Sequence, residues 1–173
     1  MIRHPAAIMW SMKRLNWRFN FNHLLRQPLL MRDLLEPWRA ELESLAAQPD
    51  ADLIEEAALV WRVMYGVVDQ WRGEFPQWQF VRHEDLSRAP VEGFRALFEH
   101  AQVEFTDSIV TYIESTTHAT NPVSAPQGQA HALRRDSRAN VAAWAAQLDA
   151  ADVHRLRDLT EDVASEWYLD ADW

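Results

Sequence analysis

The chain has 173 residues, of which 48% are hydrophobic, and this is enough for one domain with a single buried core. A net charge of −9 argues against a general nucleic-acid binder, because such a protein needs a broad basic surface. The absence of cysteine excludes disulfide and thiolate chemistry, and no apolar run reaches the ~18 to 20 residues of a membrane span. These properties together predict a soluble protein of the cytoplasm.

Helical spacing dominates the first part of the chain. Pro5 suits the first turn of a helix, and residues 6–15 carry apolar side chains along one face. Residues 16–22 are rich in aromatic and amide side chains, which predicts an irregular connection with partly buried rings. Residues 28–47 return to helical spacing, with a kink expected at Pro37.

The longest amphipathic run follows a Gln-Pro-Asp break. It is expected to begin at Asp50 or Asp52 and to end at Gly73. Residues 78–82 are the best strand candidate, because aromatic and β-branched residues stand there between Pro76 and a polar segment. Three more helices are expected over 91–101, from 106 or 107 to about 115, and from 150 to about 167.

The most unusual stretch of this acidic chain is HALRRDSRANVAAW, which places three arginines within five residues. Arg134, Arg135 and Arg138 suit an anion site. Ser137 stands just ahead of residues 139–148, which have helical spacing, so its hydroxyl is expected to cap a helix there. The backbone N–H groups of that helix would then face the same anion. A solvated basic turn, paired with nearby carboxylates, is the alternative interpretation.

A second anion-binding pair is expected near the start of the chain. Arg3 stands at the N-terminus of the first predicted helix, and Ser11 follows about two turns later. Both side chains reach one phosphate only if that group lies along the side of the helix.

The seven histidines are candidates for metal binding and for acid–base chemistry. They show no H-E-x-x-H or other ligand spacing, so no metal site is expected. His83, Glu84 and Asp85 form a possible acid–base cluster, but the favoured interpretation is that the two carboxylates anchor backbone groups in a turn. His118 lies in a polar loop, where it either touches a substrate or is solvated.

Three segments, in family order, resemble sulfotransferases that use 3′-phosphoadenylyl sulfate. IRHPAAIMWS resembles the strand-to-helix motif of that family for the 3′-phosphate. FVRHEDLSRAPVEGFRALFEH resembles its R-Y-E-D-L segment, with His83 in place of the usual tyrosine. RRDSRANVAAWAAQLDAADVHRL resembles the C-terminal cofactor loop, in the form that bacterial members have.

This resemblance implies an α/β fold: the helix-rich C-terminal part of a P-loop-type, three-layer sulfotransferase, with only one or two strands present. A single partial domain would span residues 1–173. The cofactor would be 3′-phosphoadenylyl sulfate, with adenosine 3′,5′-bisphosphate as the product. The residues that match the cofactor-binding motifs are Arg3, Ser11, Arg134, Arg135 and Ser137.

The resemblance also implies what the chain lacks. The family has its Gly-rich phosphate loop and its general base upstream of the first motif, so no catalytic residue is assigned here. We therefore expect a truncated sulfotransferase that is impaired in transferring a sulfuryl group to a hydroxyl or amine acceptor, which the sequence does not identify. Missing strands would leave a sheet edge exposed, so self-association is expected. A non-catalytic helical interaction module and a nucleotide-binding remnant are the alternatives.

Overall fold

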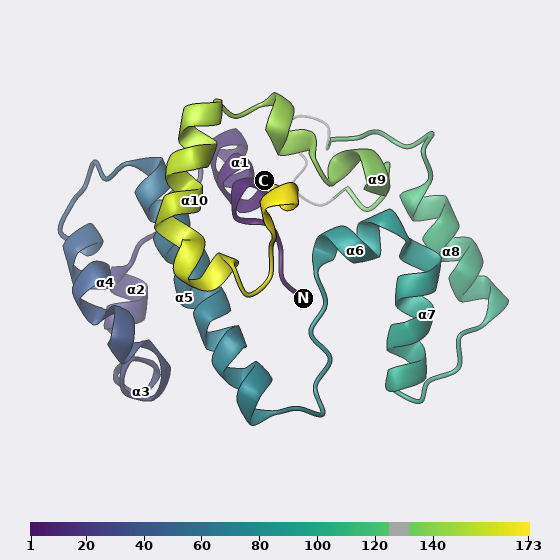
Figure 1. Cartoon of the computed structure of the whole chain (residues 1–173), viewed down its shortest axis with the longest axis horizontal. Helices are drawn as coiled ribbons and strands as arrows, with labels where there is room; N and C mark the ends of the chain where they lie inside the picture. The colour runs from purple at the N-terminus through teal and green to yellow at the C-terminus, as the bar shows by residue number, and fades with distance from the viewer. Residues whose placement is uncertain (125–131) are drawn as a thin grey trace.

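A computed structural model describes residues 1–124 and 132–173, which fold into a mainly helical structure (Figure 1). Three helices pack together at its centre: α1 (Pro5–Leu15), α5 (Leu53–Glu74) and α10 (Ala150–Ala164). On one side of them lie α2 (Asn22–Leu25), α3 (Pro28–Leu30) and α4 (Arg39–Ala46). On the other side lie α6 (His83–Arg88), α7 (Pro90–His100), α8 (Asp107–Thr117) and α9 (Ser137–Asn140).

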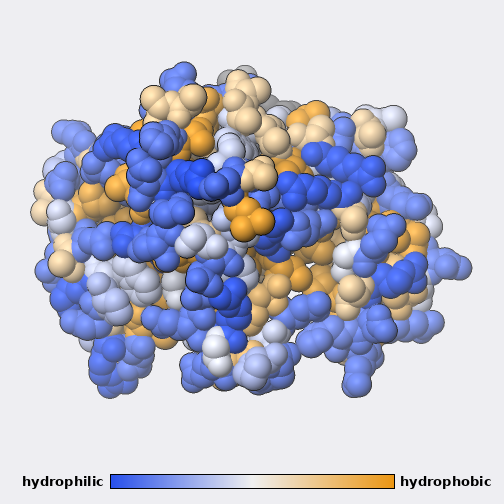
Figure 2. Space-filling model, in the orientation of Figure 1, coloured by the Kyte–Doolittle hydropathy of each residue, from blue (hydrophilic) through white to orange (hydrophobic). Residues whose placement is uncertain are grey.

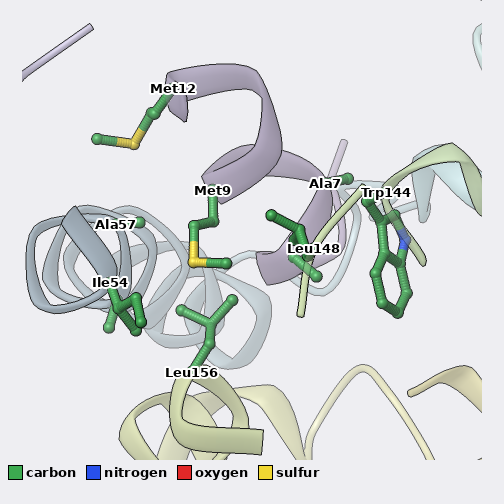
Figure 3. Packing of buried hydrophobic residues seen from close by; sticks show 10 residues of the cluster. Ala7, Met9, Met12, Ile54, Ala57, Trp144, Leu148 and Leu156 are labelled. Carbon is green, nitrogen blue, oxygen red and sulfur yellow. The ribbon is translucent and has the colours of Figure 1, made fainter. Parts of the chain in front are cut away.

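Helix α1 begins where the sequence predicts. Pro5 occupies its first turn, and the imidazole Nδ1 of His4 accepts a hydrogen bond from the N–H of Ala6. Met9 and Met12 are buried against α5 and α10, together with Ile54 and Leu156 (Figure 3). The apolar face of α1 is therefore part of the main core.

The predicted helix over 28–47 is interrupted at its predicted kink. After α3 the chain makes a wide π-helical turn over Met31–Leu35 and a tight 3-10 turn over Glu36–Trp38, and then continues as α4. Pro37 lies in the tight turn, where its missing N–H and its ring interrupt the regular hydrogen-bond pattern. The apolar stripe of this region still packs as predicted, with Trp38 and Leu42 buried against α5.

Helix α5 is the central element of the fold. Asp52 caps it by accepting a hydrogen bond from the N–H of Ile54, and the helix runs 22 residues to Glu74. Its start agrees with the second of the two predicted positions, Asp52, and its end lies one residue beyond the predicted Gly73. Its side chains contribute to all three core clusters, which explains why it has more buried residues than any other described helix.

The strand predicted over 78–82 is not formed. The described chain contains one parallel bridge, in which the N–H of Ile2 donates to the Val81 carbonyl at 2.8 Å. The Ile2 carbonyl accepts from the N–H of His83 at 2.7 Å. The described residues are therefore helix-rich, as predicted. They contain a single bridge in place of the one or two strands expected for the α/β fold.

Side chains of α5 form hydrogen bonds with the backbone of Arg3, the residue next to this bridge. The N–H of Arg3 donates to the Tyr65 hydroxyl at 3.2 Å, and the indole N–H of Trp61 donates to the Arg3 carbonyl at 2.7 Å. These bonds satisfy the backbone groups that a further strand would otherwise pair. An exposed edge remains a prediction for the outer side of residues 78–82.

The last helix is shorter than predicted, and the chain after it folds back. α10 ends at Ala164 rather than near Trp167, and a 3-10 turn over Asp170–Asp172 precedes the final residue. Tyr168 and Trp173 both make edge-on aromatic contacts with His4. None of the helices that the structure describes has the length and apolar character needed to cross a bilayer.

Candidate anion site at the start of helix α1

The bridge between Ile2 and Arg82 brings the residues that follow them close together. Arg3 follows Ile2, and His83, the first residue of α6, follows Arg82, so the charge of Arg3 acts on the His83 imidazole. Burial lowers the pKa of His83, and the nearby positive charge of Arg3 lowers it further. The imidazole is therefore predominantly neutral at pH 7 and leaves Arg3 as the charged group of the pair.

Arg3 is a half-buried cation without a carboxylate partner in the described chain. Its Nε is inaccessible to solvent and makes no hydrogen bond to residues 1–124 or 132–173. Burial lowers the pKa of Arg3, and the carboxylate of Glu84 acts in the opposite direction. Arginine stays protonated in proteins, and a buried charge without a partner is costly. A bound anion would relieve that cost.

Glu84 forms no ion pair with Arg3 and instead accepts hydrogen bonds from two other groups. The carboxylate is buried; Oε1 accepts from the N–H of His4 at 3.0 Å, and Oε2 accepts from the Tyr168 hydroxyl at 3.0 Å. Burial raises the pKa of Tyr168, and the Glu84 charge adds to this effect. Glu84 thus anchors the start of α1 from helix α6, 80 residues away, whereas the sequence predicts a carboxylate in a turn that anchors neighbouring backbone. Asp85 instead pairs with Arg82 and Arg88 on the surface.

Ion pairing separates the cations of the described chain into two groups. Most arginines are paired with carboxylates: Arg18, Arg32, Arg39, Arg62, Arg72, Arg82, Arg88, Arg155 and Arg157. In residues 1–124 and 132–173, the cations that lack such a pair gather mainly in two segments. These segments are the beginning of the chain, with Arg3, Lys13 and Arg14, and the arginine cluster, with Arg134, Arg135 and Arg138.

Hydrogen bonds to backbone carbonyls hold the arginine cluster in place, and its guanidinium groups form no ion pair with a carboxylate of the described residues. The N–H of Arg135 donates to the Thr116 carbonyl at 2.8 Å, and its guanidinium donates to the Arg134 carbonyl at 3.1 Å. Nε of Arg138 donates to the Arg88 carbonyl at 2.8 Å. The cluster therefore lies against the C-terminal ends of α6 and α8. Its alternative interpretation, a basic turn paired with carboxylates, is not seen in the described residues.

The cap predicted for Ser137 is wrong. Asp136 caps α9 by accepting from the N–H of Ala139, whereas the Ser137 hydroxyl donates to the Ser87 carbonyl at 2.8 Å. The reason is that Asp136 has the extended backbone of an N-cap and a carboxylate, which is a stronger acceptor than a hydroxyl. The predicted helix over 139–148 is also broken, because α9 ends at Asn140 and a 3-10 turn (Ala143–Ala146) follows.

The structure links Arg3 to Ser137 through α6. His83, the neighbour of Arg3, has its Nδ1 3.5 Å from the Ser87 hydroxyl, and the Ser87 carbonyl accepts from Ser137. Trp144, which follows the arginine cluster, stacks on His4 with ring centroids 4.9 Å apart. The two predicted parts of the site, the beginning of the chain and the arginine cluster, are thus connected through α6 and through His4.

The structure does not join all the predicted residues by direct contacts. Within the described chain, Ser11, Arg134 and Arg135 form no hydrogen bond or ion pair with Arg3, and Ser11 is half-buried on α1. The tyrosines that contact Arg3 and Glu84 were not predicted from the sequence, because no local pattern marks Tyr65 or Tyr168 as part of a site. Only their long-range hydrogen bonds identify them.

The remaining histidine and metal expectations concern other regions. Nδ1 of His118 lies 2.9 Å from the Thr120 hydroxyl in an exposed loop, and His118 lines a cavity of about 630 Å³ together with Ser137 and Arg138. His131 and the rest of residues 125–131 lie outside the described residues. No group of three or more His, Asp or Glu side chains in the described parts of the chain is arranged to hold a metal ion.

Comparison with known proteins gives one relative. The chain is 30% identical over 87 residues to carbohydrate sulfotransferase 1 of Danio rerio, a segment that covers 50% of this chain and 19% of that protein. No family model matches the chain, and no solved structure matches it. The similarity supports a relationship to sulfotransferases, and it covers only a small part of the relative.

Proposed function

We propose that this chain is the part of a sulfotransferase that binds the 3′-phosphate of 3′-phosphoadenylyl sulfate. The observation that carries the proposal is the half-buried guanidinium of Arg3, which lies near His83, has a buried Nε without a hydrogen bond and lacks a carboxylate partner in the described chain. The similarity to a carbohydrate sulfotransferase supports the same class of protein. A phosphate matches a planar guanidinium, because two parallel hydrogen bonds can form.

The chain would hold the phosphate from two sides. Arg3 and Ser11 would supply donors on one side, to a phosphate that lies along the side of the 11-residue helix α1. Arg134, Arg135 and Ser137 would approach from the loop that is fixed to α6. These residues bind and orient the nucleotide, and we assign no catalytic role to them.

The reaction that such binding serves is sulfuryl transfer. The cofactor would supply the sulfuryl group, and the acceptor oxygen or nitrogen would form a bond to sulfur as the bond from sulfur to the phosphate oxygen breaks. The phosphate oxygen keeps the electron pair, and the acceptor loses its proton. Among hydroxyl and amine acceptors we favour a sugar hydroxyl, because the relative is a carbohydrate sulfotransferase.

The test is calorimetric titration of the purified chain with adenosine 3′,5′-bisphosphate. Arg3→Ala and Arg135→Ala should each weaken binding by ~1 to 3 kcal/mol, the usual scale for losing a charge-assisted hydrogen bond. Arg26→Ala is the matched control, because Arg26 is an exposed arginine outside both segments and has no ion pair in the described chain. This control should bind as tightly as the original chain.

Two results would overturn the proposal. One is the absence of binding by a chain whose thermal unfolding is cooperative, since a folded protein would then lack the site. The other is equal weakening in Arg26→Ala, which would show that overall charge rather than a site attracts the nucleotide. Thermal unfolding of each variant separates loss of the site from loss of the fold.

A further inference from the structure

Backbone hydrogen bonds hold His83 beside Arg3. The N–H of His83 donates to the Ile2 carbonyl at 2.7 Å, and the N–H of Ile2 donates to the Val81 carbonyl at 2.8 Å. Arg3 directly follows Ile2, so the two segments bring a guanidinium and an imidazole together although 80 residues separate them in the sequence. The position of His83 next to Arg3 therefore does not depend on a bound ligand.

The imidazole of His83 has one nitrogen near protein groups and one nitrogen without a partner. Nδ1 lies 3.5 Å from the Ser87 hydroxyl and 4.0 Å from Oε1 of Glu84. Nε2 forms no hydrogen bond to residues 1–124 or 132–173, and 27% of the side-chain surface is exposed. In the protonated ring both nitrogens are donors, so Nδ1 could donate to Ser87 while Nε2 donates to a ligand.

The charged groups around this ring come from two segments of the chain. Burial lowers the pKa of His83 most, the charge of Arg3 lowers it further, and the carboxylate of Glu84 acts in the opposite direction. Tyr65 bonds to the backbone of Arg3, and Tyr168 bonds to Glu84. Burial raises the pKa of both tyrosines, so neither titrates near neutral pH. Of these five side chains, His83 is the one that can change its charge in the neutral to mildly acidic range.

We propose that His83 is a second ligand of the anion at Arg3 and that it makes the binding of this anion depend on pH. The inference rests on the function proposed above and adds regulation by pH to the same site. An anion beside both side chains would offset the charge of Arg3 and would attract a proton to the imidazole. The protonated Nε2 would then donate a charge-assisted hydrogen bond to the anion.

The direction of the pH dependence follows from these charges. At pH 8 the imidazole is neutral with or without the anion, so Arg3 is the charged ligand. As the pH falls, the anion-bound chain takes up a proton at His83 before the free chain does, because the anion raises the pKa of this ring. Affinity therefore increases toward acidic pH until the free chain is protonated as well. A tyrosine, which the family resemblance implies at this position, has a pKa of about 10 and would not respond in this range.

Calorimetric titration with adenosine 3′,5′-bisphosphate at pH 8 and at pH 5.5 tests the inference. The proteins are the original chain, His83→Gln, which keeps a donor that does not titrate, and His23→Gln, which removes an exposed histidine from α2. The phosphates of the nucleotide also titrate in this range, so the proteins are compared with one another at each pH. From pH 8 to pH 5.5, the affinity of the original chain relative to His83→Gln should rise about fivefold or more. Its affinity relative to His23→Gln should change less than about twofold.

Nuclear magnetic resonance of the original chain with carbon-13-labelled histidine is a second readout, which does not require a folded variant. The His83 ring is identified among the seven imidazoles by its nuclear Overhauser contacts with Ser87. Saturating nucleotide should raise the pKa of this ring by about one unit, which corresponds to a tenfold gain in affinity for the protonated form. A residue that only supports the fold would keep its pKa.

Three results would overturn the inference and leave the proposed function standing. They are nucleotide binding with the same pH dependence in the original chain and in His83→Gln, a His83 pKa that nucleotide leaves unchanged, and an equal loss of pH dependence in His23→Gln. The last result would assign the effect to the total charge of the chain. A folded chain that binds no nucleotide at either pH would overturn both proposals. Circular dichroism at each pH checks that the compared proteins are folded.

Discussion

Whether Arg3 forms an ion pair depends on residues that are far from it in the sequence. Its lack of an ion pair arises because Glu84 is already bonded to the His4 backbone and to Tyr168. The sequence motif predicts that Arg3 binds an anion, but it contains no information about which carboxylates are free. The same limitation explains the error at Ser137, where a neighbouring aspartate was the better cap.

His4 provides a prediction about pH. It is 2% exposed, and burial lowers its pKa from 6.5 to about 4. As the pH falls below 6.5, the unfolded chain binds a proton at this position that the folded chain does not bind until about pH 4. This contribution to stability is therefore complete above pH 6.5 and lost toward pH 4, a decrease of about 3 kcal/mol in the free energy of unfolding.

Urea denaturation across this pH range measures the effect, with His4→Asn as the comparison. Asparagine keeps a side-chain acceptor for the Ala6 N–H but has no group that titrates in this window. The variant should be less stable at pH 7, because the contact with Trp144 is reduced, but its stability should depend less on pH. His83 has a pKa shift of the same sign, so some dependence should remain. Equal pH dependence in both proteins would contradict the prediction.

At the scale of elements, the sequence predicts helices better than strands. Helix α5 could be located because its apolar spacing, its aspartate cap and its terminal glycine all lie within the segment itself. The segment 78–82 has strand-forming residues, but a strand needs a neighbour to pair with. In this chain its neighbour is Ile2, whose own flanking backbone groups are bonded to α5 side chains. Local composition cannot reveal that choice of partner.

Two glycines of α5 should respond in opposite ways to the same substitution. A Cβ at Gly66 would lie 2.5 Å from Cζ2 and 2.9 Å from Cη2 of Trp38, which is itself buried. The clash should exceed the ~1 kcal/mol that alanine gains from its helix propensity. We expect Gly66→Ala to lower the free energy of unfolding by ~1 to 3 kcal/mol.

Gly73→Ala is the matched control in the same helix. Nothing lies within 4 Å of a Cβ at this position, so only the gain in helix propensity remains. We expect it to raise the free energy of unfolding by up to ~1 kcal/mol. Chemical denaturation of both variants measures the two changes in the free energy of unfolding. Stabilisation by Gly66→Ala would show that Trp38 moves without cost.

At the scale of the whole molecule, the burial of side chains is uneven. The core clusters draw on α1, α5 and α10 and on the side formed by α2, α3 and α4. Among the described residues, α7 has no buried side chain and α8 has only Ile113. Figure 2 shows hydrophilic residues over most of this view, with hydrophobic residues visible between the central helices and the α7–α8 side.

This difference should appear in hydrogen exchange. Local opening costs least where few apolar contacts are lost, so amides of α7 and α8 should exchange at least tenfold faster than those of α5 and α10. Exchange followed by mass spectrometry resolves these segments. Equal protection would mean that the molecule opens only as one cooperative unit.

The contact between Trp173 and His4 has a consequence for connectivity. The two ring centroids are 4.4 Å apart, so the final residue lies against the fourth residue of the same chain. A short Gly/Ser linker between the termini would therefore produce a circular backbone with little distortion. The exposed turn at Gln48–Asp50 then offers a place where that circle can be opened, giving a permuted order of the same helices.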